Sequence, residues 1–386
     1  MDEIFSNKLR ELVETTTAVV EHKVAPDAER VDREAAWPEP AMLGFAAAGL
    51  MGLHVPARLG GHEQGLLALA ALTEVIAREC PSAALCYGMH CVATAVIAAK
   101  ATPYHENRYL RPIAEGRHIS TLSLSESGTG VHFYLSQTEL VREEGGFVVN
   151  GTKQFVTNGG RADSYVVSTR ASVLANAGEF SCLMVDRETP GIAWQEPWNG
   201  FGMRGNSSRG LKLEKARVPF ENLLGEEGDQ TWYAFEIVAP YFLMAMAGTY
   251  LGIAQAALDA TILHLQARQY THSGEVLGEM PVLQHRLAEI WTAVEKTRGL
   301  IQRAAHLGDL GDPRALVAIL ASKADAAETA VSVANEAMTL CGGAAYRENG
   351  RLSRLLRDAR AGHVMAPTTD LLKQWTGRAL LGLPLL

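Results

Sequence analysis

The sequence lacks several features that would place the chain in particular classes of protein. It has no uninterrupted apolar run of about 20 residues, the length a membrane-spanning helix needs, so no transmembrane segment is expected. It has no run of Lys or Arg, and its formal net charge of −8 argues against a general nucleic-acid-binding protein. The opening residues MDEIFSNKLREL are acidic and amphipathic, unlike a signal peptide.

Cysteine is scarce, and its distribution argues against two kinds of site. The five cysteines are Cys80, Cys86, Cys91, Cys182 and Cys341, all in apolar surroundings. Their odd number and the lack of a pairing pattern indicate reduced thiols in a protein core, as in a cytoplasmic protein. None has the spacing or partners of a zinc ligand, so we expect no metal site.

The composition is typical of a globular protein with more than one domain. The chain has 386 residues, of which 47% are hydrophobic and 20% charged, and this length predicts two or three domains. Residues 1–120 show mainly helical apolar spacing, residues 121–230 show strand-like alternation, and residues 231–386 are again helical. His90, inside an apolar helix predicted over Ala83–Ala101, is expected to be a packed, hydrogen-bonded core residue. The C-terminal helices are predicted near residues 233–268, 281–308, 312–341 and 364–381.

The segment from Leu122 to Thr169 has the most informative pattern. An apolar strand-like run leads into a turn at Glu126–Gly130. Two alternating runs follow, Phe147–Asn150 and Phe155–Thr157, separated by Gly151. The period-2 alternation and the Asn-Gly steps predict antiparallel strands joined by tight turns.

Two further motifs accompany this segment. GMRG occupies residues 202–205, and LSRLLRDAR occupies residues 352–360. Together with the strand–turn block and TNG at residues 157–159, they resemble the acyl-CoA dehydrogenase family of flavoproteins over almost the whole chain. The resemblance implies an α+β multidomain fold: an N-terminal α-helical domain, a central antiparallel β-domain and a C-terminal four-helix bundle. It also implies FAD, an acyl-CoA or acyl-carrier-protein substrate, an electron-transfer flavoprotein or oxygen as acceptor, and a homodimer or homotetramer.

The resemblance assigns the flavin ring to residues of the central block. Leu124 and Ser125 would lie against the isoalloxazine, with the Ser125 hydroxyl and N–H near the redox nitrogen. Phe155 would form a flat wall where the family usually has Trp, and Thr157 would supply a hydroxyl donor. Considered alone, Phe155 would be assigned to core packing within a strand.

The rest of the cofactor would be held by residues of the C-terminal helices. Arg268 matches the family's arginine that reaches the FAD pyrophosphate of a neighbouring subunit, a task that suits a guanidinium fork. Thr339 and Gly342-Gly343 match positions that hold the adenosine half against another subunit. Thr368 and Asp370 match cofactor contacts near the end of the chain. The alternatives are a solvated surface role for Arg268, a helix end at the glycine pair, and a helix N-cap at Asp370.

Both positions at which the family places its catalytic Glu are apolar here. The usual position is Ala366, and the position used by a minority of members is Phe242. Desaturation of an acyl thioester requires removal of the α-proton, and a positioned base contributes about 10²–10⁴-fold. Three side chains are candidates for this role: His363 and Asp370, one helical turn before and after Ala366, and His132.

The turn after the first strand also departs from the family. Gly130 is retained and is carried over with Val131 as a cofactor-binding position. Val131 replaces the usual Ser, and His132 replaces an acidic residue. Leu243 stands where an Arg usually follows the second base position, and Glu236 is a weaker candidate base. These changes favour an unusual acyl group, as in specialised biosynthetic pathways.

Three functions therefore remain open. The first is an FAD enzyme that oxidises an acyl thioester at its α and β carbons. The second is a flavin-dependent monooxygenase on the same fold, which needs no α-proton base. The third is a catalytically inactive flavoprotein that serves as a binding or assembly subunit.

Overall fold

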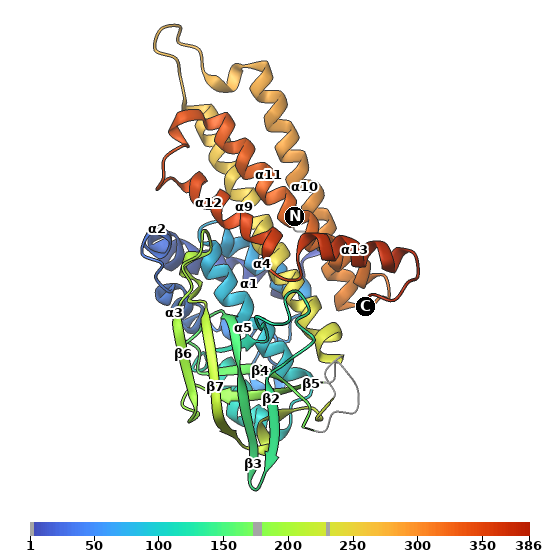
Figure 1. Ribbon diagram of the computed structural model, residues 1–386. Coiled ribbons are helices and arrows are strands. Elements are labelled where there is room, and N and C mark those ends of the chain that lie inside the picture. Colours follow the sequence, from blue (N-terminus) through green and yellow to red (C-terminus); the bar gives the residue numbers. More distant parts are fainter. Residues whose placement is uncertain (1–3, 173–179, 229–231) are drawn as a thin grey trace.

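The computed structural model describes residues 4–172, 180–228 and 232–386. Along the chain a helical part comes first, two β-sheets follow, and long helices complete the structure (Figure 1). This order confirms the predicted α+β multidomain fold with a β-domain between two helical regions. A large core runs through both helical parts, and a smaller core fills the space between the sheets.

The N-terminal helices surround one central helix, α5 (Pro81–Ala99), which is buried from Pro81 to Ile97. His90, on this helix, is fully buried as expected. Its Nε2 lies 3.0 Å from the carbonyl oxygen of Met51, and its Nδ1 accepts a hydrogen bond from the N–H of Ser120 at 3.2 Å. The other helices here are α1 (Asn7–Val19), α2 (Ala28–Arg33), α3 (Glu39–Ala47), α4 (Leu66–Ala77), α6 (Pro103–His105) and α7 (Arg111–Ala114).

Two long helices are apolar apart from the polar residues that interrupt them. Pro81–Ala99 and Tyr233–Ala267 are long and apolar enough to cross a membrane by length and composition alone. In the fold, 89% and 78% of their most apolar windows are buried inside the protein, so both serve as core helices. Interior polar residues such as His90 interrupt the sequence pattern without interrupting the buried surface.

The five cysteines are free and buried, which confirms the predicted core thiols. Burial raises the pKa of Cys80 and of Cys91 to about 12, because a thiolate loses its hydration there.

The β-domain consists of two four-stranded sheets. One has the order β1-β4-β5-β8 and the other β2-β3-β7-β6. β1 pairs in parallel with β4, whereas the other pairs are antiparallel, so the prediction of antiparallel strands was wrong for the first strand. The strands are β1 (Ser120–Ser123), β2 (Glu139–Glu143), β3 (Gly146–Val156), β4 (Ser164–Arg170), β5 (Phe180–Asp186), β6 (Ile192–Pro197), β7 (Arg209–Val218) and β8 (Leu223–Leu224).

Gly151 lies inside β3 and does not separate two strands, contrary to the sequence prediction. The register between β3 and β7 shifts between Val149 and Gly151, which marks an irregularity in one continuous strand. A Cβ at Gly151 would meet the Thr138 hydroxyl at 2.6 Å, so the glycine allows this close approach. The strand continues past it to Val156.

The C-terminal part contains three long helices and two shorter ones. α11 packs against each of the other four, which places it at the centre of the bundle. The helix predicted near residues 364–381 begins only at Thr369, and a further helix that was not predicted from the sequence ends at Val364. The helices are α9 (Ala239–Ala267), α10 (Pro281–Asp309), α11 (Ala315–Cys341), α12 (Arg351–Val364) and α13 (Thr369–Leu380).

Polar contacts tie the N-terminal helices to the bundle. The carboxylate of Asp309, at the end of α10, accepts hydrogen bonds from the N–H groups of Leu66 (2.5 Å) and Leu67 (3.1 Å). It therefore caps α4 across a separation of more than 240 residues in sequence. The buried Arg298 guanidinium of α10 pairs with Glu74 of α4 at 2.5 Å. These contacts fix the position of α10 against α4.

The buried His90 makes acid stability testable. Burial lowers the pKa of His90 to about 4 from the usual value near 6.5. Between these values the unfolded chain binds a proton that the folded chain does not, so the free energy of unfolding falls as pH falls. In His90→Gln we expect this dependence to be weaker by about 1.4 kcal/mol per pH unit. Denaturant unfolding between pH 4.5 and 7 measures it, with the exposed His272→Gln as control. Parallel curves for wild type and His90→Gln would contradict the burial argument.

Candidate active site

A cavity of about 660 Å³ lies where the three parts of the chain meet. Helix α5 supplies Leu85 and Met89 on one side. The β-domain supplies the loop after β1, the end of β3 and residues between β6 and β7. The C-terminal part supplies the start of α9, one face of α12 and the segment that follows it. This placement, between helices and the edge of a sheet, is typical of ligand-binding cavities.

The structure brings together six of the residues singled out in the sequence. All six come from the β-domain and line this cavity, although Gly130 of the turn and Phe155 near the end of β3 are far apart in the sequence. They are Leu124, Ser125, Gly130, Val131, Phe155 and Thr157.

Phe155 reaches the cavity because β3 bulges at its end. The register against β7 shifts between Lys153 and Val156, and Phe155 has a φ of +54°. This left-handed conformation is a genuine outlier for a bulky residue and turns the ring out of the core. The ring is 59% exposed and stands edge-on to Trp198, with centroids 5.9 Å apart. The two rings leave a flat apolar face toward the cavity, so the core-packing alternative for Phe155 is wrong.

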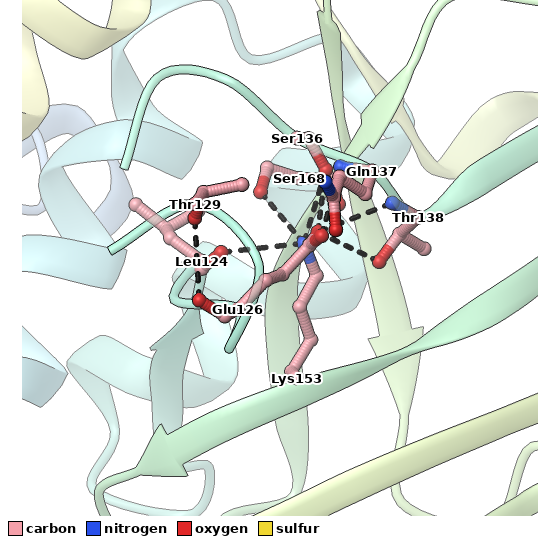
Figure 2. Close-up of polar contacts among 8 residues, drawn as sticks. All are labelled: Leu124, Glu126, Thr129, Ser136, Gln137, Thr138, Lys153 and Ser168. Carbon is pink, nitrogen blue, oxygen red and sulfur yellow. Dashed lines mark hydrogen bonds and ion pairs between the residues drawn. The ribbon is translucent and has the colours of Figure 1, made fainter. Parts of the chain in front are cut away.

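A buried ion pair supports the turn that lines the cavity (Figure 2). The Oε1 of Glu126 accepts hydrogen bonds from Lys153 Nζ (2.5 Å), Ser136 Oγ (2.7 Å) and the Thr138 hydroxyl (2.8 Å) and N–H (3.2 Å). Its Oε2 accepts from the Gln137 N–H at 2.8 Å. The two side chains are 5% and 0% exposed, and five hydrogen bonds hold the Glu126 carboxylate in its charged form beside Lys153.

Lys153 connects the turn to two strands. Its Nζ also donates to the carbonyl oxygen of Leu124 at 3.3 Å and to the hydroxyl of Ser168, in β4, at 2.9 Å. Burial lowers the pKa of Lys153 to about 8, and Glu126 opposes that shift. Burial raises the pKa of Glu126, but the charge of Lys153 and the hydrogen bonds outweigh it and lower the pKa overall. Sequence reasoning missed this pair, although Lys153 lies in the same block as Phe155 and Thr157.

Two adjacent residues of helix α12, Arg357 and Asp358, attach it to the loop between β6 and β7. The buried Asp358 carboxylate accepts the N–H of Met203 at 2.6 Å, and burial raises the pKa of Asp358 to about 7. The Arg357 guanidinium pairs with Asp32 and donates to the carbonyl oxygen of Phe201 at 3.2 Å. A Cβ at Gly202 would meet the Arg357 carbonyl oxygen at 2.2 Å, so only glycine allows this approach. The RDAR motif therefore positions a cavity wall.

Both apolar replacements for the family's base lie in the cavity wall. Phe242 comes from α9, and Ala366 from the segment after α12. Glu126 is the one carboxylate among the described residues that line the cavity. Its oxygens accept hydrogen bonds from Lys153 and from groups beside it. Arg357 and Arg360 supply positive charge to the same surface.

The three candidate bases lie outside the cavity lining. His132 is exposed, and its Nδ1 lies 2.8 Å from the hydroxyl of Tyr134. His363 is half-buried on a different face of α12 from the lining residues, and burial lowers its pKa. Asp370 is exposed in the first turn of α13, where Thr368, and not Asp370, caps the helix by accepting the N–H of Leu371.

Of the other positions assigned to the cofactor, Thr368 directly follows the lining residue Pro367, whereas Arg268, Thr339 and the glycine pair belong to the far ends of two long helices. Arg268 ends α9, Thr339 lies in the last turn of α11, and Gly342-Gly343 follow it, all exposed at the end of the bundle away from the β-domain (Figure 1). Gly342 has a φ of +60° and ends the helix. The structure thus separates the predicted cofactor residues into a cavity group and an outer group on the bundle.

The described part of the chain holds no cluster of three or more His, Cys, Asp or Glu side chains suited to a metal ion. The cavity instead offers flat aromatic faces, the hydroxyl groups of Ser125, Thr157 and Ser208, and an apolar wall opposite them. This combination fits a planar, hydrogen-bonding ring such as the isoalloxazine of FAD.

Known proteins match the chain over nearly its full length. Cyclohex-1-ene-1-carbonyl-CoA dehydrogenase of Geobacter metallireducens is 32% identical over 364 residues, which cover 94% of this chain and 95% of that protein. The mitochondrial 2-methylacyl-CoA dehydrogenase of Solanum tuberosum is 29% identical, covering 96% and 90%. A solved structure from work on the electron transferring flavoprotein of Acidaminococcus fermentans has a TM-score of 0.92 and 26% identity, covering 99% of this chain and 100% of that one.

Three domain families match in chain order. The acyl-CoA dehydrogenase N-terminal domain matches residues 6–117, the middle domain residues 121–216 and the C-terminal domain residues 243–381. These matches cover most of the chain and agree with the observed order of helices, sheets and helices. The chain therefore belongs to the acyl-CoA dehydrogenase family.

Proposed function

We propose that this chain is an FAD-dependent oxidoreductase that acts on an acyl thioester carried by coenzyme A or by an acyl carrier protein. The observation that carries the proposal is the cavity itself. It gathers the residues that the family resemblance assigns to the flavin, and it sets Phe242 and Ala366 in the same wall. A flavin ring beside Phe155 would leave room for a thioester between the ring and Ala366.

The chain's own residues would hold the cofactor in two groups. Phe155 would cover the ring, while Ser125 and Thr157 would donate hydrogen bonds to its edge. When bound, FAD would supply the acceptor for the hydride that leaves the β-carbon of the substrate. The outer group, Arg268, Thr339 and Gly342-Gly343, is not among the residues that line this cavity. The family resemblance assigns it to FAD of a second subunit, so we propose a homodimer or homotetramer. Thr368 and Asp370 are proposed as further contacts.

We propose α,β-dehydrogenation of an unusual acyl group in a specialised pathway as the reaction. One proton leaves the α-carbon and one hydride leaves the β-carbon, so the substrate loses two electrons. Phe242 and Ala366 cannot bind a proton, so they would instead contribute apolar surface to the acyl site. Val131, in the turn, would add a further apolar surface.

A flavin-dependent monooxygenase is the second candidate, and one observation favours it. No uncommitted carboxylate and no imidazole is found among the described residues that line the cavity. Reaction of reduced flavin with oxygen does not require removal of an α-proton, so such a cavity would suffice. The inactive subunit remains a third alternative.

Two further proposals concern the electron acceptor and the compartment. An electron-transfer flavoprotein or oxygen would reoxidise the enzyme. A cytoplasmic location agrees with five buried, unpaired thiols, which a reducing compartment would preserve.

The proposed oxidation is tested by the colour of the flavin. We expect the purified yellow protein, titrated without oxygen with a panel of acyl-CoA thioesters, to lose its flavin absorbance with at least one of them, because hydride transfer reduces the ring. Free coenzyme A is the control and should leave the absorbance unchanged. Two results together would favour the monooxygenase over the dehydrogenase. No thioester would bleach the flavin, and oxygen would be consumed when the flavin is reduced chemically and a thioester is added.

The candidate bases are tested by substitution. Because His132, His363 and Asp370 lie outside the cavity lining, we expect His132→Ala, His363→Ala and Asp370→Asn each to keep the rate of anaerobic bleaching close to that of wild type. Stopped-flow absorbance with the best thioester of the panel measures this. A loss of about 10²-fold or more in one variant, with FAD still bound, would identify that residue as the base.

The buried pair is tested by removing one charge and then both. Lys153→Met leaves Glu126 buried without a counter-ion, so we expect a loss of about 3–5 kcal/mol in the free energy of unfolding and a lower FAD content. The double variant Glu126→Leu/Lys153→Met should be less destabilised than Lys153→Met alone. Lys212→Met, which removes an exposed lysine paired with Glu214, is the matched control and should cost less than about 1 kcal/mol. Equal losses for the two lysine variants would refute the role of the pair.

A further inference from the structure

Lys323 is a buried lysine whose ammonium group has no carboxylate partner among the described residues. It lies in α11 and is 0% exposed. Its Nζ donates to three carbonyl oxygens, those of Gly362 (2.8 Å), Met365 (3.1 Å) and Pro367 (2.9 Å). Burial alone accounts for the change in its pKa, which agrees with the absence of a nearby negative charge.

Two of the three acceptors, Met365 and Pro367, belong to residues that line the cavity. Met365, Ala366 and Pro367 all line it, and Gly362 is in the last turn of α12. The ammonium group therefore sits directly behind the residue that stands at the family's usual base position. The backbone of residues 362–367 lies between the Lys323 ammonium group and the cavity.

Close packing brings Lys323 to this place. A Cβ at Gly362 would meet the Cβ of Ala327 at 2.7 Å, so the glycine lets α12 lie against α11. The Lys323 side chain then reaches the end of α12 without entering the cavity. Such a contact satisfies carbonyl groups that the helix itself leaves unpaired.

Without Lys323 this wall would present the negative end of a helix. The unpaired carbonyls at a helix C-terminus act as roughly half a negative charge. A full positive charge placed on the same carbonyls reverses the sign of the local potential. The desolvated position of Lys323 strengthens this effect, because no water screens the charge from the cavity.

The charges around Lys323 leave this effect uncancelled. On α12, the pKa of His363 is lowered first by burial, then by the charge of Arg360, and to a smaller extent by the charge of Lys323. On α11 and α13, Glu328 and Lys373 form an exposed ion pair with each other. Lys153, the other fully buried lysine, is different because Glu126 neutralises it.

We propose that Lys323 is a positioning residue that holds the 362–367 wall in place and makes its potential positive, and so stabilises negative charge that forms in the cavity. The inference rests on the proposed function, in which reduction of the flavin and loss of the substrate α-proton both add negative charge in the cavity that this wall helps to enclose. It assigns an electrostatic role to this wall, where the usual carboxylate is replaced by Ala366.

The flavin midpoint potential, measured without substrate from pH 6 to pH 9, tests the inference. The variants are Lys323→Gln, which keeps N–H donors without the charge, and Lys323→Arg, which keeps both. We expect a lower potential in Lys323→Gln than in wild type at pH 6, because reduction is no longer favoured by the positive charge. Burial lowers the pKa of Lys323 to about 7, so the difference should narrow above that pH. Lys323→Arg should keep the high potential throughout, since Arg stays charged.

Lys373→Gln is the matched control, because it removes a positive charge from the same region at an exposed position. Its potential should equal that of wild type. Equal potentials in wild type and Lys323→Gln at pH 6, with both proteins fully loaded with FAD, would overturn the inference and leave the proposed oxidation standing. A potential difference of the expected sign, with no thioester able to bleach wild type, would instead overturn the proposed reaction alone.

Discussion

The burial of two opposite charges, Glu126 and Lys153, is the constraint on which the cavity depends. Neither group can reach water, so each requires the other, and together they fasten the turn after β1 to β3 and to Ser168 of β4. Breaking one leaves an uncompensated charge in the interior. Phe155 follows Lys153 by two residues on the same strand, so the pair that anchors the turn also fixes the strand from which the aromatic wall projects.

Much of the fold could be predicted from periodicity, because a buried helix face and a half-buried strand leave different spacings in the sequence. The core role of His90 and the reduced cysteines followed from their apolar neighbours. Of the candidate site, the resemblance singled out Ser125 and Thr157, which line one cavity, while their contacts with a flavin stay a prediction. Phe155 lines the same cavity, but its left-handed backbone depends on a register shift against β7 and is not encoded in local spacing. Pairings between distant segments, such as Lys323 with the end of α12, leave no local pattern at all.

The candidate bases show how a local geometric assumption fails. Placing His363 and Asp370 one turn either side of Ala366 assumes that all three share one helix. The chain instead leaves α12 at Val364 and begins α13 at Thr369, so spacings of three or four residues no longer place side chains on one face. What remains at the wall is an apolar surface with a buried cation, Lys323, behind it. On the function and the Lys323 role proposed above, electrostatic potential and shape would govern the chemistry at that surface more than a proton acceptor.

The unusual backbone of Phe155 would make the stability of the folded chain depend on the proposed FAD. A bulky residue in the left-handed region costs on the order of 1–3 kcal/mol, and its exposed ring adds a hydrophobic penalty of its own. A planar partner stacked on the ring offsets part of both, and anything that binds only the folded chain raises its stability by mass action. The unloaded chain is then the species that chaperones and proteases encounter most often. Abundance of this enzyme in the cell would follow the supply of riboflavin even at constant synthesis.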